Sequence, residues 1–122
     1  MKIYVSGPMR GYEEYNFPAF YAAEEVLRTQ GHEVVNPARV EEEQYGFDRH
    51  VSLEKQDFDM QTTILCDVEA VLDCDAIYLL KGWWHSKGAF AEYAIARWGG
   101  KKVRHEARWR GLVELKRLLK KG

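Results

Sequence analysis

The chain has 122 residues, which is enough for one domain with a single core but not for two. Its composition, 46% hydrophobic and 30% charged, is that of a globular protein, and no apolar run approaches the roughly 20 residues of a membrane span. The net charge is −1, and the only cysteines, Cys66 and Cys74, support neither a zinc quartet nor a disulfide framework, so we expect free thiols.

The first third of the chain predicts a strand, a loop and a helix. Lys2–Ser6 has the pattern of a strand and not of a signal peptide, so we expect a cytoplasmic protein. Gly7–Gly11 is a loop rich in turn residues. Apolar residues at helical spacing then predict a helix that begins at Pro18 and stops at Gly31.

The middle of the chain predicts a strand, a polar loop and a second helix. Glu33–Asn36 is the strand, and the acidic, mixed stretch Ala38–His50 is expected to be a surface loop with at most one helical turn. Leu53–Asp73 is the predicted helix. The residues expected to form its packing face are Phe58, Gln61, Ile64, Leu65, Val68 and Leu72.

The last part continues the alternation, with strands at Ala76–Leu80 and Lys101–His105 and helices at Lys87–Trp98 and Arg110–Lys120. Strands that alternate with helices imply a parallel sheet, right-handed crossovers and helices on both faces. We therefore expect one α/β domain over residues 1–122, a flavodoxin-like or Rossmann-like three-layer sandwich with a parallel sheet of four or five strands.

Charge is distributed unevenly along the chain. Residues 1–100 carry nine Lys/Arg against seventeen Asp/Glu, whereas residues 101–122 carry nine against two. The basic tail is interpreted first as a solvated helix face and second as a subunit contact. A nucleic-acid site is the least favoured interpretation, because the tail has no interleaved aromatics beyond Trp109.

Glu92 is the one charge inside the apolar helix Lys87–Trp98, which we expect to be covered on most sides. An unpaired buried carboxylate is costly, so Glu92 has either a partner or a place in a cleft. A structural carboxylate bound to an arginine or a hydroxyl explains it as well as a functional one does.

Two loops at the carboxyl ends of the predicted strands could bind anions, and ligands bind at these ends in such sheets. Ser6, Gly7, Arg10 and Gly11 offer a hydroxyl, a guanidinium and two glycines, which suits a phosphate, although the pattern alone is weak. Ser86 and the amides that follow it, including Gly88, form either a second anion site or an ordinary N-cap.

Further candidates are less certain from the residues alone. Asp67 could reach the cleft and form, with Glu92, the carboxylate pair that glycosyl transfer requires. Asp75 precedes its strand and is expected to be structural. Trp83 could stack a nucleobase or could pack in the core or an interface. No histidine or cysteine spacing predicts a metal site, and no cofactor is implied.

At these residues the sequence resembles the nucleoside 2-deoxyribosyltransferase-like superfamily, most closely its small uncharacterised bacterial and phage branch. The superfamily also contains 2′-deoxynucleoside 5′-monophosphate N-glycosidases. The resemblance covers about residues 2–103. The stretches that carry it are Tyr4–Gly11, Asn16–Pro18, Gly31–Pro37, Cys74–Leu80 and Gly82–Glu92.

The resemblance implies roles for individual residues. Glu92 matches the nucleophile that attacks C1′ of the sugar, Asp67 matches the acid that helps the base to leave, and Tyr4 matches a tyrosine near the nucleophile. The residues that match phosphate-contacting or phosphate-loop positions are Ser86, Gly7, Arg10 and Gly88.

We therefore expect an N-glycosidase or deoxyribosyltransferase that acts on a nucleoside monophosphate or related nucleotide, without a metal or cofactor. A non-catalytic nucleotide-binding or sensing domain is the alternative. The resemblance implies a homodimer or higher homo-oligomer, and neither a membrane nor nucleic acid is expected as a partner. True deoxyribosyltransferases complete the site with a neighbour's carboxy-terminal segment, which the Lys/Arg-rich end does not match, so a phosphorylated substrate is favoured over base exchange.

Overall fold

The computed structural model describes residues 1–106 and Leu119. The expected helix Arg110–Lys120, like most of the basic tail, lies outside these residues. The described chain forms a four-stranded parallel sheet in the order β2-β1-β3-β4, which confirms the predicted α/β class. The strands are β1 (Lys2–Ser6), β2 (Glu33–Val35), β3 (Ala76–Leu79) and β4 (Lys102–His105). The helices are α1 (Phe17–Thr29), α2 (Pro37–Tyr45), α3 (Met60–Asp73) and α4 (Lys87–Trp98), with short 3-10 turns at Glu13–Asn16, Leu53–Lys55 and Trp83–His85.

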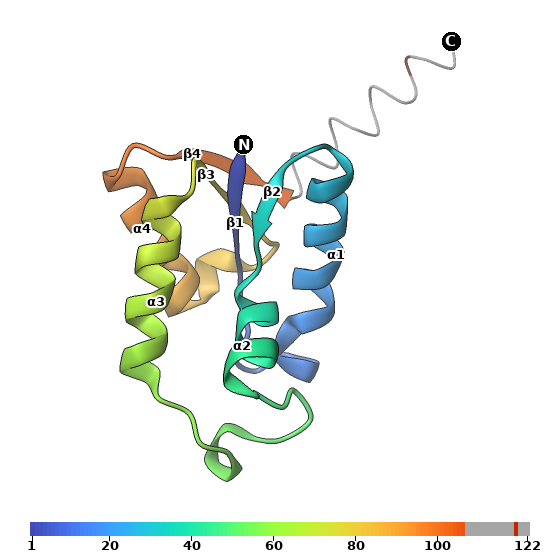
Figure 1. Ribbon diagram of the computed structural model, residues 1–122, viewed down its shortest axis with the longest axis vertical. Helices are drawn as coiled ribbons and strands as arrows, with labels where there is room; N and C mark the ends of the chain where they lie inside the picture. Colours follow the sequence, from blue (N-terminus) through green and yellow to red (C-terminus); the bar gives the residue numbers. More distant parts are fainter. Residues whose placement is uncertain (107–118, 120–122) are drawn as a thin grey trace.

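Helices cover both faces of the sheet, with α1 on one side and α3 and α4 on the other (Figure 1). Alternate residues of the central strands serve the two faces. Ile3 and Val5 of β1 pack with Phe20 of α1, whereas Tyr4 packs with Val71 of α3 and Ala96 of α4. The two central strands are buried along almost their whole length, as parallel strands covered on both faces must be.

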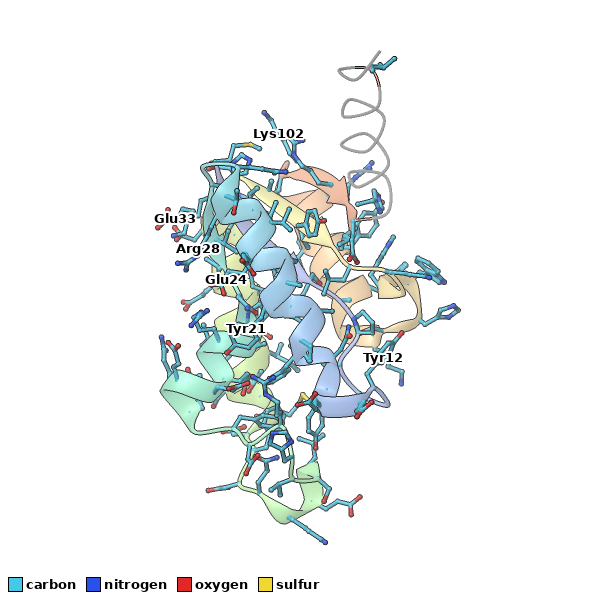
Figure 2. The ribbon with its side chains drawn as sticks, turned by 90° about the vertical axis from the view of Figure 1, so that its right-hand side faces the viewer. Tyr12, Tyr21, Glu24, Arg28, Glu33 and Lys102 are labelled. Atoms are coloured by element: carbon cyan, nitrogen blue, oxygen red, sulfur yellow. The ribbon has the colours of Figure 1, made fainter. Side chains whose placement is uncertain are left out.

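The carboxyl ends of the strands meet at one edge of the sheet. Figure 2 places Glu33 and Lys102, the first residues of β2 and β4, toward one end of the molecule and Tyr12 toward the other. Tyr12 belongs to the loop after β1, and it lies against Gly82 in the loop after β3, because a Cβ on Gly82 would stand 2.8 Å from the Tyr12 hydroxyl. These two loops therefore form one surface at the carboxyl edge.

The turn before α1 holds an unusual conformation. Glu14, Tyr15 and Asn16 all have positive φ, between 52° and 62°, which is uncommon for residues other than glycine. Asn16 donates from Nδ2 to the Pro8 carbonyl at 2.9 Å, and Tyr15 donates its hydroxyl to the Val51 carbonyl at 2.7 Å. These bonds fix the loop that follows β1, and backbone strain of this kind is concentrated near functional sites.

The prediction of a surface loop over Ala38–His50 is wrong, because α2 spans Pro37–Tyr45 and Ala38 is fully buried. Asn36 caps this helix by accepting a bond from the Ala38 amide at 3.0 Å, and Gly46 ends it with φ of 66°. The capping residue Asn36, the first-turn proline Pro37 and the terminal glycine Gly46 all indicate a helix in the sequence. The charged residues between them favour a surface loop, which is the prediction that the structure contradicts.

The predicted start and packing face of the second long helix are also wrong. Helix α3 begins at Met60, where Asp59 caps the first turn, and not at Leu53. It packs inward through Val71, while Ile64, Leu65 and Leu72 are exposed. On α4, Phe90 and Trp98 are exposed as well, so this helix is less covered than its composition predicted. Among the described helices, none is long and apolar enough to cross a membrane.

Candidate active site

The Glu92 carboxylate is held by two hydroxyl groups from β1. Tyr4 donates its hydroxyl to Oε2 and Ser6 donates its hydroxyl to Oε1, each at 2.7 Å. Tyr4 and Ser6 are two residues apart on one strand, so their side chains leave the same face of the sheet. The Ser6–Glu92 contact joins the end of β1 to α4, the helix after β3. In the strand order β2-β1-β3-β4, the connections after β1 and after β3 lead toward opposite edges of the sheet, so the contact lies at the topological switch point where ligands bind in such sheets.

Glu92 is only partly buried, and within residues 1–106 it forms no ion pair with a cation. Burial raises the pKa of its carboxyl, and hydrogen bonds from Ser6, Tyr4 and Asp67 partly offset that effect. The acid is therefore oriented on both oxygens without being neutralised by a base. That arrangement leaves a negative charge available to a ligand.

Asp67 lies close enough to Glu92 and Tyr4 for these groups to affect the pKa of its carboxyl. Burial, followed by the negative charges of Glu92 and Glu41, raises the pKa of Asp67 to about 8. Two carboxyl groups in contact cannot both ionise easily, and they share a proton. We place that proton on Asp67, because the Ser6 and Tyr4 hydroxyls favour the ionised form of Glu92.

Tyr4 is buried, with 1% of its surface exposed. Burial, together with the charges of Glu92 and Asp67, raises the pKa of its phenol well above the usual value. Tyr4 therefore stays protonated and acts as a hydrogen-bond donor. The structure brings together the three residues predicted as catalytic, Tyr4, Asp67 and Glu92.

The loop after β1 positions two further predicted residues at the same edge. Gly7 passes so close to β3 that a Cβ would lie 2.7 Å from the Leu80 Cβ, which explains the glycine. Gly11 has φ of 82°, in the region that glycine adopts freely. Arg10 is exposed, its one hydrogen bond is a long contact of 3.7 Å to the Met60 sulfur, and it pairs with no carboxylate in residues 1–106.

Ser86 caps α4, as predicted, by accepting from the Ala89 amide at 3.2 Å. The amides of Lys87 and Gly88 belong to the first turn, whose donors have no acceptor within the helix. A Cβ on Gly88 would meet only the Ser86 hydroxyl, at 4.0 Å, so the space beside this turn is open.

A hollow of about 300 Å³ lies beside the first turn of α4, lined by Trp84, His85, Ser86, Lys87, Phe90 and Ala91. A larger hollow of about 500 Å³, lined by residues 42 and 46–50, contains none of the predicted site residues.

The structure gives Ser6 surroundings that the sequence did not predict, and for Trp83 it shows the packing that was one of the predicted alternatives. The Ser6 hydroxyl, expected to face an anion, is fully buried and bound to Glu92. The Trp83 ring lies 4.7 Å from the Tyr93 ring and 6.0 Å from the Phe90 ring, between centroids. Its indole therefore packs among neighbouring aromatic side chains at the start of α4.

Sequence reasoning missed the Ser6–Glu92 bond and the acid Glu41, which is buried on α2 and whose charge contributes to the raised pKa of Asp67. The period-two spacing of Tyr4 and Ser6 was the signal for the first. The second has no comparable signal, because the acidic stretch Ala38–His50 predicts a surface loop. Asp75 is structural, as predicted, since its Oδ2 accepts from the Lys2 amide at 2.8 Å. Both cysteines are free thiols, as predicted.

In chemical terms the site pairs an ionised carboxylate with a protonated one, beside a loop and a helix start that can bind an anion. Such a pair can attack a carbon and protonate a leaving group in the same step. In the described part of the chain, no group of three or more His, Cys, Asp and Glu could hold a metal ion.

Comparisons with known proteins place this geometry in a family. The family with the description "Domain of unknown function (DUF4406)" matches residues 1–105. Among solved structures, the chain is similar to a 2-deoxyribosyltransferase from the psychrotolerant bacterium Bacillus psychrosaccharolyticus, at 23% identity and a TM-score of 0.63. That match covers 86% of this chain and 71% of the other, and it confirms the predicted resemblance at the level of the fold. No curated protein matches the chain.

Proposed function

The chain belongs to the family described as a domain of unknown function, DUF4406, and we propose that it cleaves the base–sugar bond of a nucleoside 5′-monophosphate or related nucleotide. The activity is that of an N-glycosidase or a deoxyribosyltransferase, and it requires no cofactor. The observation that carries the proposal is that two hydroxyls hold Glu92 and no cation within residues 1–106 does. It is joined by the neighbouring Asp67, to which we assign a proton because its pKa is raised. The likeness of the fold to a 2-deoxyribosyltransferase supports it.

In the first step an oxygen of the Glu92 carboxylate attacks C1′ of the sugar. The C1′–N bond breaks, and its electron pair goes to the base nitrogen. Asp67 transfers its proton to the departing base, which leaves as a neutral molecule. The products of this step are the free base and a glycosyl ester on Glu92, with Asp67 now ionised.

In the second step the ester is released. Asp67 accepts a proton from water while the water oxygen forms a bond to C1′, and the bond from C1′ to Glu92 breaks. Glu92 returns as a carboxylate and Asp67 returns protonated, so the cycle is balanced. If a second base takes the place of water, the same chemistry is a transfer. Tyr4 and Ser6 orient the Glu92 carboxylate throughout, which is the role that we assign to Ser6 in place of phosphate binding.

The phosphate of the substrate is assigned to Arg10, the Gly7–Gly11 loop and the first turn of α4. Arg10 has a guanidinium that no described carboxylate neutralises, and a helix start favours an anion. Ser86 and Gly88 would present the α4 amides to it. Trp83 stays a predicted base-stacking residue, and the proposal includes a cytoplasmic location, where nucleotides are made and consumed.

The test is a panel of deoxynucleoside and ribonucleoside monophosphates, with the matching nucleosides, read by mass for free bases. We expect base release from at least one monophosphate, and sugar phosphate as the second product in water. Adding a different free base to the mixture would reveal transfer as a new nucleotide. The Arg10→Gln variant is expected to raise KM for the monophosphate about tenfold or more while leaving the KM for a nucleoside unchanged.

The alternative function is a nucleotide-binding or sensing domain that performs no turnover. Calorimetry on the same mixtures separates the two functions. Binding of a nucleotide without any free base in the chromatogram would favour the sensing domain. Release of base at a constant rate over many turnovers would exclude it.

We also propose that two copies of the chain associate through the outer faces of α3 and α4, which pack against each other. Large apolar side chains are exposed along both helices: Met60, Ile64, Leu65, Leu72, Phe90 and Trp98. Charge favours a second copy as the partner. Helix α3 carries the exposed acid Glu69 and no base, whereas α4 carries Lys87 and Arg97. A two-fold axis would bring α3 of one copy against α4 of the other.

Sedimentation of the protein and of two variants tests this surface. Leu65→Lys places a charge at the centre of the apolar face and is expected to yield monomers. Val26→Lys introduces the same charge at an exposed apolar position on α1 and should leave the dimer intact. A monomeric native protein at micromolar concentration would contradict the proposal.

A further inference from the structure

The crevice beside Glu92 is bridged by an aromatic side chain. In parallel sheets a ligand enters between the loops that follow the two strands at the topological switch point, which here are β1 and β3. Glu92 is held at the end of β1, where the Ser6 hydroxyl donates to its Oε1 at 2.7 Å. The loop after β1 begins at the next residue, and its Tyr12 lies against Gly82 in the loop after β3 (Figure 2). Tyr12 therefore spans the gap between the two loops.

The loop after β3 is the fixed side of this contact. The Lys81 amide donates to the Glu106 carboxylate at 2.9 Å, which ties the loop to the end of β4. The Trp83 ring lies 4.7 Å from the Tyr93 ring of α4, between centroids. Gly82 stands between these two anchors, with φ of 87°. Any movement that separates the two loops is therefore expected in the loop after β1.

The loop after β1 is anchored at both ends and has an exposed tip, residues 10–12. Before the tip, Met9 packs against the hydrophobic core. After it, Asn16 donates from Nδ2 to the Pro8 carbonyl at 2.9 Å. The tip itself is a turn that is closed by a hydrogen bond from the Tyr12 amide to the Met9 carbonyl at 3.3 Å. The tip therefore projects from two fixed points.

Only weak contacts hold the side chains of the tip. Arg10 reaches the Sδ of Met60 at 3.7 Å, and a thioether sulfur is a weak acceptor. The Tyr12 hydroxyl touches Gly82 but has no hydrogen-bond partner in the part of the chain that the structure describes. Gly11 has φ of 82°, and a Cβ there would meet nothing within 4 Å, so this glycine serves the turn and not the packing. The tip can therefore move as a unit while its ends stay in place.

We propose that Tyr12 is a gating residue, which covers the crevice at Glu92 in the free protein and swings away when a nucleotide enters. Neither of the two hollows described above is lined by Tyr4, Asp67 or Glu92, which is consistent with a site that a side chain closes. Arg10 lies on the same tip, so the movement that uncovers Glu92 also carries the guanidinium assigned to the phosphate. The inference rests on the proposed function for the identity of the ligand, but not for the gate or its test.

The test is the rate at which a water-soluble carbodiimide and glycinamide convert the Glu92 carboxyl into an amide, read by mass spectrometry of its peptide. Glu25, an exposed acid on α1 of the same protein, provides the reference rate. Tyr12→Ala removes the cover, and we expect Glu92 to react about tenfold faster or more, because only the minor open population reacts in the native protein. Tyr12→Phe keeps the ring and should retain the native rate. Equal Glu92 rates in Tyr12→Ala and the native protein would overturn the proposal.

A second variant keeps the test decisive should Tyr12→Ala fail to fold. Gly11→Ala adds a methyl group in open space but disfavours the positive φ on which the turn depends. We expect Glu92 to react faster in Gly11→Ala than in the native protein, and a native rate would count against the gate. Because the labelling needs no substrate, it decides on Tyr12 even if the nucleotide panel gives no base release. Faster labelling in Tyr12→Ala, with no base released from any nucleotide, would support the gate and remove the proposed function.

Discussion

Two glutamates of this protein, the buried Glu24 on α1 and the partly buried Glu92 on α4, have partners of opposite kinds. Glu24 is bound by Arg39 through three hydrogen bonds of 2.7 to 3.1 Å and by Arg28 at 3.0 Å. Burial raises the pKa of the Glu24 carboxyl, but Arg39 and its other partners outweigh burial, and the pKa ends below its usual value. For Glu92, hydroxyl groups are the partners and the pKa ends above its usual value.

Under the proposed function, this difference separates an acid that stabilises the fold, Glu24, from an acid that reacts with the substrate, Glu92. Two arginines satisfy Glu24 completely, so its charge has nothing left to offer a ligand (Figure 2 shows Glu24 and Arg28 along the same flank of α1). Hydroxyls orient Glu92 without neutralising it, and a protonated Asp67 stands beside it. The partner of a buried acid is therefore a better guide to its role than its burial.

The largest expected effect comes from exchanging the carboxylate for an amide, in separate variants, at Glu92 and at Glu24. Glu92→Gln removes the nucleophile and is expected to lower kcat for base release about a thousandfold or more. Glu24→Gln should retain the native kcat, because α1 carries none of the reacting groups. Chromatography of free base under single-turnover conditions measures both. Equal activity of Glu92→Gln and the native enzyme would end the proposed mechanism.

The free energy of unfolding should change more in Glu24→Gln than in Glu92→Gln, the reverse of the order expected for kcat. Glu24→Gln leaves Arg39 without its main partner and is expected to lower the free energy of unfolding by about 2 kcal/mol. Glu92→Gln should change it by less, since removal of an uncompensated buried charge offsets the altered hydrogen bonds. Urea denaturation followed by circular dichroism gives both values. A larger loss for Glu92→Gln than for Glu24→Gln would contradict the structural role of Glu24.

Removing the Ser6 hydroxyl tests whether this group orients the Glu92 carboxylate for the reaction. Ser6→Ala deletes the donor to Oε1 and leaves Tyr4 on Oε2. We expect kcat to fall about tenfold with little change in KM, because an orienting bond acts on the reaction and not on substrate binding. The pKa of Glu92 should also rise, which would move the acid limb of the pH profile upward. A rise in KM alone would instead assign Ser6 to the phosphate.

The smallest expected effect is on the pH dependence of stability. Asp67 releases its proton near pH 3.8 when unfolded and near pH 8 when folded, so the native state binds more protons between these values. Stability contributed by this group is therefore lost as pH rises from about 4 to about 8. Because Asp67 is only half-buried, the loss is about 1 kcal/mol. Asp67→Asn should flatten the dependence of the urea midpoint on pH across this range. An unchanged dependence would show that the proton is bound by a group other than Asp67.

Most of the fold could be predicted from the sequence, because β1, β3 and α4 have strong local patterns. Buried apolar runs marked the two central strands, and Ser86 marked the start of α4. Helix α2 was missed although Asn36, Pro37 and Gly46 bounded it. Its acidic composition hid a buried face that depends on contacts with the rest of the fold, and such contacts are not a local property.

The sequence predicted which residues form the candidate site but not which hydrogen bonds join them. The resemblance named Tyr4, Asp67 and Glu92, and the structure adds that the hydroxyls of Tyr4 and Ser6 hold the glutamate. The outward direction of Ile64 and Leu65 was also missed, because helical periodicity identifies an apolar face without saying what covers it. Pairings between distant elements require the three-dimensional fold.

Mass spectrometry of peptides from protein quenched with acid, during incubation with a deoxynucleoside monophosphate, can detect the covalent step on Glu92. We expect a deoxyribose phosphate ester on the peptide that contains Glu92, absent from Glu92→Gln and lost on a chase without substrate. Steady release of base with no adduct on that peptide, and the same rate in Glu92→Gln, would contradict it.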